Sequence, residues 1–513
     1  MEKKSRFLET IILIAVMILT VVRPGPVLAD DQTEEAAGSS ASAPEAGPLE
    51  DNLVTTKHTA VINGKELSYT AETGTMIVNT ADQTCEIFYT AYTLDDTEDL
   101  SDRPITFAFN GGPGCCSMYL HIGCLGPRRL ELDKDGTAVK MPTRLVDNDN
   151  SLLDMTDLVF IDAVGTGYSR PAGNSELEAF IGYDNDNRTI GDFIRQYVSR
   201  NDRWESKKYL AGESYGTIRA VGVCNYLADT YSMYLNGLML ISCANDLSTL
   251  SPNSGNELPY TMFLPTYAAD AWYHKKVSEE YQKMDLEDFL DVVREFVEKE
   301  YVPALFAGNQ LTKSEKNSIA EKIASYTGLS VDYVLDKNLR ISLDEFSEEL
   351  LHDQKLVIGS YDGRISGPVI GSGDTRVDPS DVSAELAYGS AVNDYFANEL
   401  GFRTDRTYLP IDYDIMPAWK YPGDASSGFF CQEETIYKCM SANSFLKVWV
   451  LCGYYDGATP FYSAEWIYRH IFLNDEQKDN LSFTYYPCGH MIYMEKDSLI
   501  QFRKDASAWY SEN

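Results

Sequence analysis

The sequence predicts an α/β fold in which helices flank a mostly parallel central sheet and a helical cap is inserted late in the chain. Three observations predict it. Short apolar runs of strand length recur and end in glycine-rich loops, as buried parallel strands do. Helical stretches lie between these runs, which indicates a sheet covered on both faces. The alternation stops between about residues 250 and 440, where apolar residues recur among charged ones at helical spacing.

The chain is expected to open with an antiparallel meander. Residues 59–93 contain runs rich in β-branched and aromatic side chains, with turn signals between them. A helix is expected over Thr217–Ala228, directly after one of the later strands. The apolar runs that predict the buried parallel strands are Ile105–Phe109, Leu158–Ile161, Lys208–Ala211, Leu238–Ile241 and Leu446–Leu451.

The inserted block is expected to be helical. Amphipathic spacing predicts helices over Val277–Tyr301, Lys313–Tyr333 and Ser342–Leu351. Because strand-like runs resume afterwards, we interpret residues 251–439 as a cap inserted into a single core. That core is expected to consist of residues 56–250 and 440–513.

The N-terminus has the order of a secretory signal. Basic residues precede an apolar run over residues 8–22, and Val27 and Ala29 supply the small residues of a cleavage site. The run is shorter than the roughly 20 residues of a spanning helix, so an uncleaved anchor is the alternative. We expect a signal peptide over residues 1–29 and a flexible acidic leader over residues 30–55. The protein is expected to be secreted or on the cell surface, with no stable membrane span once the signal is cleaved.

The net charge and the cysteine pattern argue against some classes of partner and cofactor for this chain. The chain carries 43 basic and 78 acidic residues, a formal net charge of −35, which repels nucleic-acid phosphates and anionic membrane surfaces. The ten cysteines include no Cys-x-x-Cys pair with a partnering histidine pattern, so a structural zinc site is not expected. No metal or organic cofactor is implied by the sequence. Export permits disulfides, and Cys431 with Cys439 is the first candidate for a local one. The oligomeric state does not follow from the sequence.

A nucleophile motif lies at a predicted strand-to-helix junction. Gly212-Glu213-Ser214-Tyr215-Gly216 matches Gly-x-Ser-x-Gly, after an apolar strand and before the expected helix. In that setting the serine occupies a strained turn at a helix N-terminus, where backbone N–H groups favour developing negative charge. The alternative is a chance match, because glycine and serine are common. The motif therefore predicts Ser214 as a nucleophile and the Tyr215 amide as an oxyanion donor.

A serine hydroxyl needs a base, and the α/β-hydrolase fold supplies the acid and then the histidine after late strands. Asp456 follows the run Leu446–Leu451, and His490 follows a strand-like run near the C-terminus. A buried carboxylate that accepts from the imidazole would hold its tautomer and stabilise the imidazolium. Taken singly, a solvated aspartate and a loop histidine are the alternatives. Jointly with Ser214, these residues predict a catalytic triad on an α/β-hydrolase fold.

A glycine-rich loop follows the first expected parallel strand. Asn110-Gly-Gly-Pro-Gly114 comes directly after Ile105–Phe109, at the end of the strand that faces a hydrolase site. Its backbone can supply the second oxyanion donor, and the alternative is a plain tight turn.

Together these motifs resemble the serine carboxypeptidase family. The loop Asn110–Cys115, the stretch 162–169, the Ser214 motif, Asp456 and His490 follow the family's order and spacing from about Thr59 to the C-terminus. The style is similar to that of bacterial members, which share runs like Leu-Gly-Pro-Arg-Arg at residues 125–129 and Leu-Pro-Thr-Tyr-Ala-Ala at residues 264–269.

The resemblance implies a role for each motif. Ser214, Asp456 and His490 would be catalytic, and the amides of Gly112 and Tyr215 would form the oxyanion hole. Asn110 and Glu213 would bind the terminal carboxylate of a peptide substrate. A carboxyl group buried beside the nucleophile should have a raised pKa. When protonated, Glu213 would donate a hydrogen bond to that carboxylate rather than repel it.

The sequence departs from the family's pattern at three positions. Eukaryotic relatives have Glu-Leu-Gly-Pro where this chain reads Cys124-Leu-Gly-Pro, so one carboxyl group of the carboxylate-binding network is missing. Arg128 or Arg129 could supply charge there, although a structural role is the more ordinary expectation. Cys116 stands where a serine is common, and Thr217 replaces a usual glycine.

The function expected from these features is that of an exported serine carboxypeptidase, which removes C-terminal residues from peptides through an acyl-enzyme on Ser214. An esterase or acyltransferase on the same triad needs no carboxylate recognition and is the first alternative. A catalytically inactive binding protein is the second. The substrate expected for the leading hypothesis is a peptide with a free C-terminus.

Overall fold

The structure is a computed structural model that describes residues 49–132, 142–371, 377–424 and 427–512. The expected signal peptide and most of the expected leader lie outside these residues. The last residues of the expected leader are not flexible but belong to a strand. The first strand of the structure begins at Asn52, and Asn52 pairs with Thr75 of the next strand. Within the described ranges, every helix is too short or too polar to span a lipid bilayer.

A single large sheet organises the core. Its strand order is β1-β2-β3-β7-β4-β9-β10-β13-β14, with β8 (Arg170–Ala172) paired to β3 beside this path. The strands of this order are β1 (Asn52–Ile62), β2 (Lys65–Thr80), β3 (Gln83–Leu94), β4 (Ile105–Phe109), β7 (Asp157–Ile161), β9 (Lys208–Glu213), β10 (Gly237–Ile241), β13 (Lys447–Gly453) and β14 (Leu481–Tyr486). The expected meander and all five expected parallel strands are confirmed.

Burial explains why the two halves of the sheet have different sequences. From β7 to β14 all neighbours are parallel, whereas β1, β2, β3 and β7 pair antiparallel in turn. Every residue of β4, β7 and β10 is buried, so these strands are continuous apolar runs. In β1 exposed and more buried positions alternate over much of the strand, as expected for an edge strand with one face toward solvent.

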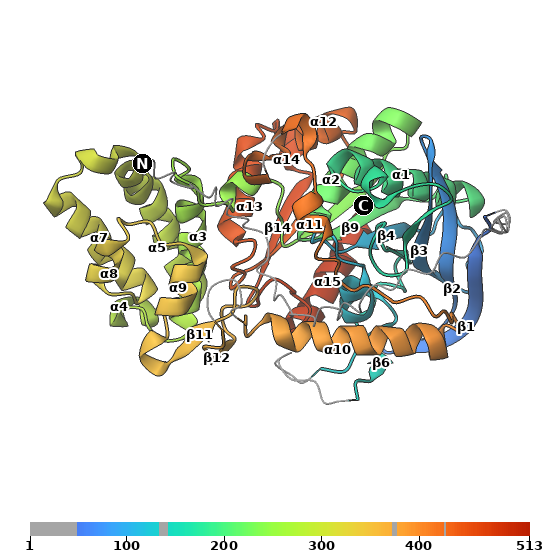
Figure 1. Cartoon of the computed structure of the whole chain (residues 1–513), viewed down its shortest axis with the longest axis horizontal. Coiled ribbons are helices and arrows are strands. Elements are labelled where there is room, and N and C mark those ends of the chain that lie inside the picture. The colour runs from blue at the N-terminus through green and yellow to red at the C-terminus, as the bar shows by residue number, and fades with distance from the viewer. Residues whose placement is uncertain (1–48, 133–141, 372–376, 425–426, 513) are drawn as a thin grey trace, which may run out of the picture.

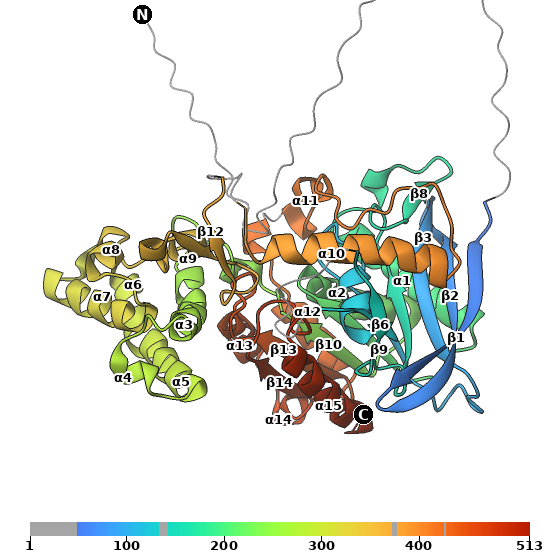
Figure 2. The same cartoon turned by 90° about the horizontal axis from the view of Figure 1, so that it is seen from below.

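The sheet separates two apolar cores. Leu210 of β9 packs into one with the helices α1 (Tyr183–Arg200) and α2 (Tyr215–Tyr231). Its neighbours Tyr209 and Ala211 pack into the other with α10 (Asp381–Asp394) and α15 (Lys496–Glu512). The period of two along a strand produces this division. Both views show α10 running alongside the core from near β12 toward β1 (Figures 1 and 2).

The inserted block begins with a lobe of helices at one end of the molecule (Figure 1). Its members are α3 (Leu258–Tyr273), α4 (Glu279–Gln282), α5 (Leu286–Phe296), α6 (Val302–Ala307), α7 (Lys313–Thr327), α8 (Val331–Asp336) and α9 (Leu343–Glu349). Capping boxes at Thr312 and Ser342 start α7 and α9. We refer to α3–α9 as the helical lobe.

Two of the helices expected in this lobe are broken. The segment Val277–Tyr301 divides into α4 and α5, because Asp285 before α5 has extended backbone dihedrals. The segment Lys313–Tyr333 divides at Gly328, which ends α7 in the left-handed conformation at a φ of 71°. Helical spacing persists across both breaks, so periodicity alone did not reveal them.

The chain returns from the lobe to the core through a short hairpin. Strand β11 (Leu356–Ile358) pairs antiparallel with β12 (Ser366–Pro368), and the connecting residues 359–365 form the hairpin tip. The hairpin lies between the helical lobe and the core in both views (Figures 1 and 2). Further along, α11 (Ile415–Ala418) and α12 (Glu433–Ala442) precede β13.

The predicted disulfide between Cys431 and Cys439 is wrong for this structure. All ten cysteines lie in described residues, and all are free thiols. Cys431 is exposed beside Asp246, whereas Cys439 on α12 is buried against the Val221 carbonyl of α2. The start of a helix between the two cysteines turns their side chains to different surroundings.

Candidate active site

Ser214 occupies a strained turn between β9 and α2. Its backbone has a φ of 60° and a ψ of −127°, which is unusual for a residue with a side chain. A Cβ on Gly212 would lie 2.1 Å from the Gly216 carbonyl oxygen, and one on Gly216 would lie 2.8 Å from the Phe109 carbonyl oxygen of β4. The two glycines therefore permit the close approach that the turn requires. Ser214 is half-buried at the end of the parallel sheet.

Thr217, which departs from the family's glycine, ties this turn together. Its hydroxyl donates to the Ser214 carbonyl at 2.7 Å and accepts from the Ala244 amide at 3.0 Å. The Ser214 amide donates to Ile241 at the end of β10. The nucleophile's backbone is thus fixed from two neighbouring elements of the core. Sequence analysis did not predict this role for Thr217.

The structure brings Asp456 and His490 together after the last two strands. His490 Nδ1 lies 2.8 Å from Asp456 Oδ2, although 34 residues separate them along the chain. Asp456 has no exposed surface. Its carboxylate also accepts hydrogen bonds from the Ala458 amide and from the amide and hydroxyl of Thr459. A carboxylate with these donors can orient the imidazole and keep Nδ1 as the protonated nitrogen.

The environment of His490 favours its protonated form. Burial lowers the pKa of His490, but the Asp456 carboxylate, with its hydrogen bond, and Glu213 together raise it above its ordinary value. An imidazole of this kind is suited to take a proton from a nearby hydroxyl and then to release it.

The Ser214 and His490 segments both attach to the end of β10. The Ser214 amide donates to Ile241, and the hydroxyl of the next residue, Ser242, donates to the His490 carbonyl at 2.5 Å. Among the described residues, no hydrogen bond joins the Ser214 hydroxyl to the imidazole. Contacts of this kind often form fully only in the substrate complex.

The glycine-rich loop after β4 lies beside the nucleophile turn. A Cβ on Gly111 would lie 2.5 Å from the Tyr215 amide nitrogen. Gly112 has a φ of 102°, which a side chain would strain. In the described part of the chain, neither the Gly112 nor the Tyr215 amide has a hydrogen-bond acceptor. Both N–H groups are therefore available to an oxyanion.

Asn110 and Glu213 form a buried pair next to Ser214. The Asn110 amide donates to Glu213 Oε1 at 3.0 Å, and its own carbonyl oxygen accepts from the Leu120 amide. Glu213 Oε2 is buried, and the Tyr493 hydroxyl lies close to this carboxyl group. Burial raises the pKa of Glu213 to about 7, against the opposing influence of His490. Near neutral pH this carboxyl group therefore exchanges between an acid that can donate and an anion that cannot.

Arg128 does not take the place of the missing family glutamate, whereas Arg129 exerts a charge effect on the nearby Tyr388. Cys124 is fully buried, and burial followed by the nearby Glu213 raises the pKa of its thiol. Arg128 is held away by Glu399 and Asp147. The structure instead brings two phenols to this place, since a Cβ on the preceding Gly123 would lie 2.7 Å from both the Tyr388 hydroxyl and the Tyr493 ring.

Several residues around the triad were missed by sequence analysis. Thr459 lies three residues after Asp456, and that local spacing could have identified it as a donor to the carboxylate. Ser242 and Tyr361, which bind the backbone of His490, come from distant segments. No local sequence signal marks the latter two residues.

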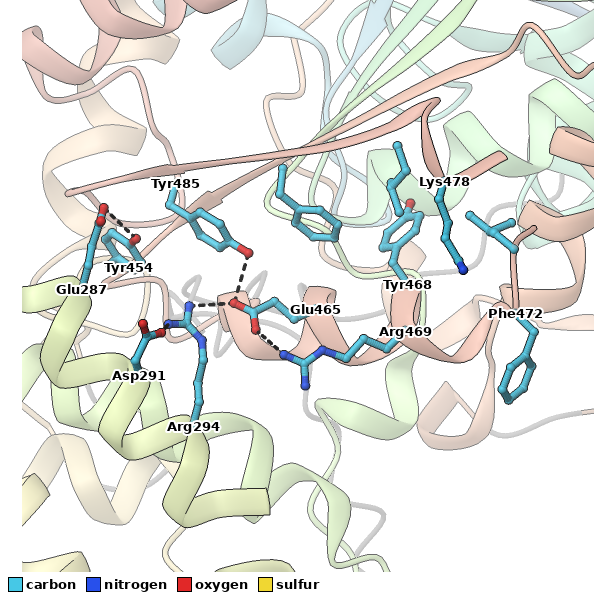
Figure 3. A pocket seen from close by; sticks show the side chains of 13 residues that line it. Glu287, Asp291, Arg294, Tyr454, Glu465, Tyr468, Arg469, Phe472, Lys478 and Tyr485 are labelled. Atoms are coloured by element: carbon cyan, nitrogen blue, oxygen red, sulfur yellow. Dashed lines mark hydrogen bonds and ion pairs between the residues drawn. The ribbon is translucent and has the colours of Figure 1, made fainter. Parts of the chain in front are cut away.

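A separate pocket of about 990 Å³ lies between α5 of the helical lobe and the core elements α13 (Phe461–His470) and β14 (Figure 3). Its charges neutralise one another. Glu465 pairs with both Arg294 and Arg469, and Arg294 also pairs with Asp291. None of the predicted site residues lines it. Of the remaining charged lining residues, Glu287 accepts a hydrogen bond from the Tyr454 hydroxyl and Lys478 pairs with Asp475.

Comparison with known proteins identifies similar chains. The family model described as serine carboxypeptidase matches residues 63–323, which include the Asn110 loop and Ser214 but not Asp456 or His490. Serine carboxypeptidase-like 29 of Arabidopsis thaliana is 29% identical over 166 residues, which are 30% of this chain and 32% of that protein. The pheromone-processing carboxypeptidase KEX1 of Yarrowia lipolytica is 29% identical over 176 residues, 34% of this chain and 26% of that protein.

These matches span about a third or less of the curated relatives' length. The relatives are plant and yeast proteins, so they do not support the narrower resemblance to bacterial members. Among solved structures, KEX1(delta)p, a prohormone-processing carboxypeptidase of Saccharomyces cerevisiae, matches with a TM-score of 0.53 and 18% identity. That match covers 87% of this chain and 91% of the other. It confirms the α/β-hydrolase fold.

Proposed function

Because this chain belongs to the serine carboxypeptidase family, we propose that it removes C-terminal residues from peptides. Ser214 is the nucleophile, His490 the general base and acid, and Asp456 the group that orients the histidine. The amides of Gly112 and Tyr215 stabilise the oxyanion.

The observation that carries the exopeptidase proposal is the Asn110–Glu213 pair beside the nucleophile. A buried carboxyl group with a pKa of about 7 is largely protonated in mild acid. It then donates a hydrogen bond to a peptide's terminal carboxylate, which Asn110 also contacts. Above neutral pH Glu213 becomes an anion and repels that carboxylate. Binding of peptide acids should therefore weaken as pH rises through about 7.

The proposed reaction proceeds in two steps. Ser214 Oγ attacks the carbonyl carbon of the last peptide bond, and its proton passes to His490. The histidine gives this proton to the departing nitrogen, so the C-terminal amino acid leaves and an acyl-enzyme remains. Water then attacks the acyl group with His490 again as base. The proton returns to Ser214, and the shortened peptide is released.

The rest of the chain has a role consistent with this chemistry. We propose that the inserted block, residues 251–439, roofs the cleft and shapes the pocket for substrate side chains. We also propose export, which the N-terminal order of basic, apolar and small residues supports. The narrower assignment to the bacterial style of the family stays a prediction from sequence runs alone.

A comparison of two substrates tests the proposal. A blocked dipeptide with a free C-terminal carboxylate and its C-terminal amide are assayed from pH 4 to pH 8. We expect turnover of the acid to exceed that of the amide, with a KM for the acid that rises above about pH 7. Equal turnover of both would favour an esterase or acyltransferase and defeat the carboxypeptidase proposal.

Labelling with a fluorophosphonate tests the nucleophile separately. The wild-type protein should be labelled, and the Ser214→Ala variant should not. Absence of labelling in the wild type would favour an inactive binding protein. Loss of activity in the variant with an unchanged thermal unfolding midpoint would assign the effect to chemistry rather than to folding.

A further inference from the structure

The hairpin tip reaches the predicted catalytic histidine from the inserted block. The Tyr361 carbonyl accepts a hydrogen bond from the His490 amide at 2.6 Å. The Tyr361 ring also packs edge-on against the imidazole, with ring centroids 5.3 Å apart and an interplanar angle of 64°. Tyr361 therefore contacts both the backbone and the side chain of His490, although 129 residues separate them in the chain.

The tip also touches the segment that carries Asp456. The Gly363 amide donates to the Tyr455 carbonyl at 3.0 Å. A Cβ on Gly457 would lie 2.8 Å from the Ser360 carbonyl oxygen. On the histidine side, a Cβ on Gly489 would lie 2.3 Å from the Tyr361 carbonyl oxygen. The tip is thus packed against the segments that follow both β13 and β14.

An ion pair, a hydrogen bond to the core and a contact with α3 fix the hairpin tip in place. Arg364 pairs with Asp362 at 2.6 Å and donates to the Pro487 carbonyl at 2.6 Å. From α3, the buried carboxyl group of Asp270 lies directly against Gly363, where a Cβ would come within 2.1 Å of its oxygen. Burial raises the pKa of Asp270 well above its usual range. The helical lobe therefore supports the tip through the packing of Asp270 against Gly363.

The position of His490 in the fold creates a need for such support. It lies between the end of β14 at Tyr486 and the start of α15 at Lys496, in a segment with no strand or helix of its own. The bond from Asp456 fixes Nδ1 but leaves rotation of the ring about that bond and shifts of the backbone. The hydrogen bond from the His490 amide to the Tyr361 carbonyl limits the backbone shifts, and the contact between the two rings limits rotation of the imidazole.

We propose that Tyr361 is a positioning residue for His490, supplied to the reaction by the hairpin tip of the inserted block. This inference rests on the proposed function. Its ring holds the imidazole in the orientation from which Nε2 can reach the Ser214 hydroxyl. Displacements of about 1 Å in a catalytic group cost up to about 100-fold in rate, so a loosened imidazole should have a measurable effect.

The variants Tyr361→Ala and Tyr361→Phe test the proposal in the full-length protein. Tyr361→Ala should lower kcat for the peptide acid by about tenfold or more, with KM changed by less than about threefold. Tyr361→Phe keeps the ring and should stay within about twofold of the wild type. Equal losses in the two variants, or a loss in KM alone, would overturn the proposal. If Tyr361→Ala fails to fold, Tyr361→Leu serves, since it keeps apolar volume but removes the ring.

Tyr273→Ala is the matched control. Tyr273 ends α3, packs its ring against Tyr455 with centroids 5.6 Å apart, and does not contact His490 in the described contacts. It should retain wild-type kcat, and a loss as large as that of Tyr361→Ala would overturn the proposal.

The rate of fluorophosphonate labelling separates this inference from the proposed function. A wild-type protein that does not label at all contradicts the proposed function. A wild type that labels, with a Tyr361→Ala variant that labels equally fast, contradicts only the role of Tyr361. We expect the variant to label about tenfold more slowly.

Discussion

The nucleophile turn and the histidine segment are built on different principles. Ser214 is held by its sequence neighbours, because Gly212, Gly216 and Thr217 fix the turn between β9 and α2. His490 has no such local support, and partners from β10 and from the hairpin tip bind its backbone. Both segments are tied to the end of β10, but Ser214 also has a locally strained turn, whereas the His490 segment depends on tertiary contacts.

This difference predicts which substitutions affect the Ser214 turn and which affect the His490 segment. Substitutions near Ser214 act on a short stretch of the core and should affect folding and chemistry together. Substitutions around His490 can loosen the base while Ser214 keeps its strained backbone. Substitutions in each half test this difference separately, and their expected effects range from a large loss of kcat to a small one.

Asp456→Asn should give the largest loss on the histidine side. An asparagine amide would offer a donor to Nδ1 and favour the wrong tautomer of His490. We expect kcat to fall by about 10³–10⁴-fold, with little change in KM. Steady-state kinetics on the peptide acid measure this. A loss below tenfold would show that Asp456 does not orient the base.

Glu213→Gln tests the surroundings of Ser214 through the pH dependence of the free energy of unfolding. Burial raises the pKa of Glu213 to about 7 from the ordinary 4.5 of a glutamate, so between these values the native protein binds a proton that the unfolded chain releases. The contribution of this group to the free energy of unfolding is therefore largest below about pH 4.5 and is lost as pH rises to about 7. The loss should reach about 3 kcal/mol, and the glutamine variant should lack it. Urea unfolding of both proteins at pH 5 and pH 8 measures the difference.

The same variant also has a kinetic signature. A glutamine amide is a donor at every pH, so the KM of Glu213→Gln for the peptide acid should not rise above neutrality. A KM that still rises with the wild-type profile would assign the effect to another group near Glu213, such as His490, because the pKa values of Tyr493, Cys124 and Tyr388 are raised away from neutrality by burial.

Gly489→Ala should force the hairpin tip and the His490 segment apart. The added Cβ would meet the Tyr361 carbonyl oxygen and the Asp362 side chain, so one of the two segments must move. We expect kcat to fall by up to about 100-fold, while Ser214 and its turn keep their structure. Gly389→Ala, on α10 where the backbone is not left-handed and the nearest neighbouring side chain is Pro410 at 3.7 Å, controls for the general effect of adding a methyl group. A fall of the same size in that control would contradict the comparison.

Thr459→Val should give the smallest effect. The Thr459 hydroxyl donates to Asp456 Oδ2 at 2.6 Å, and the Ala458 and Thr459 amides remain as donors when it is removed. Loss of one of three donors should lower kcat by up to about tenfold. Thr459→Ser keeps the hydroxyl and should restore most of the activity. An unchanged kcat in Thr459→Val would show that the two amides are sufficient to hold the carboxylate.

The sequence was sufficient to predict the sheet, the turn at Ser214 and the pairing of Asp456 with His490, because each depends on a local pattern at the end of a strand. It was insufficient where distant segments meet. The break at Gly328 and the separate surroundings of Cys431 and Cys439 depend on packing that spacing does not encode. The contact of Tyr361 with His490 depends on the path of a 129-residue connection.

The hairpin tip limits how the enzyme could be dissected or redesigned. A shortened chain that joins residue 250 to residue 440 would retain the strained serine, the acid and the histidine in its sequence. It would lack the carbonyl group that binds the His490 amide. If Tyr361 positions His490 as proposed, the inserted block cannot simply be exchanged, and a graft from another hydrolase would need to supply an equivalent contact for this histidine.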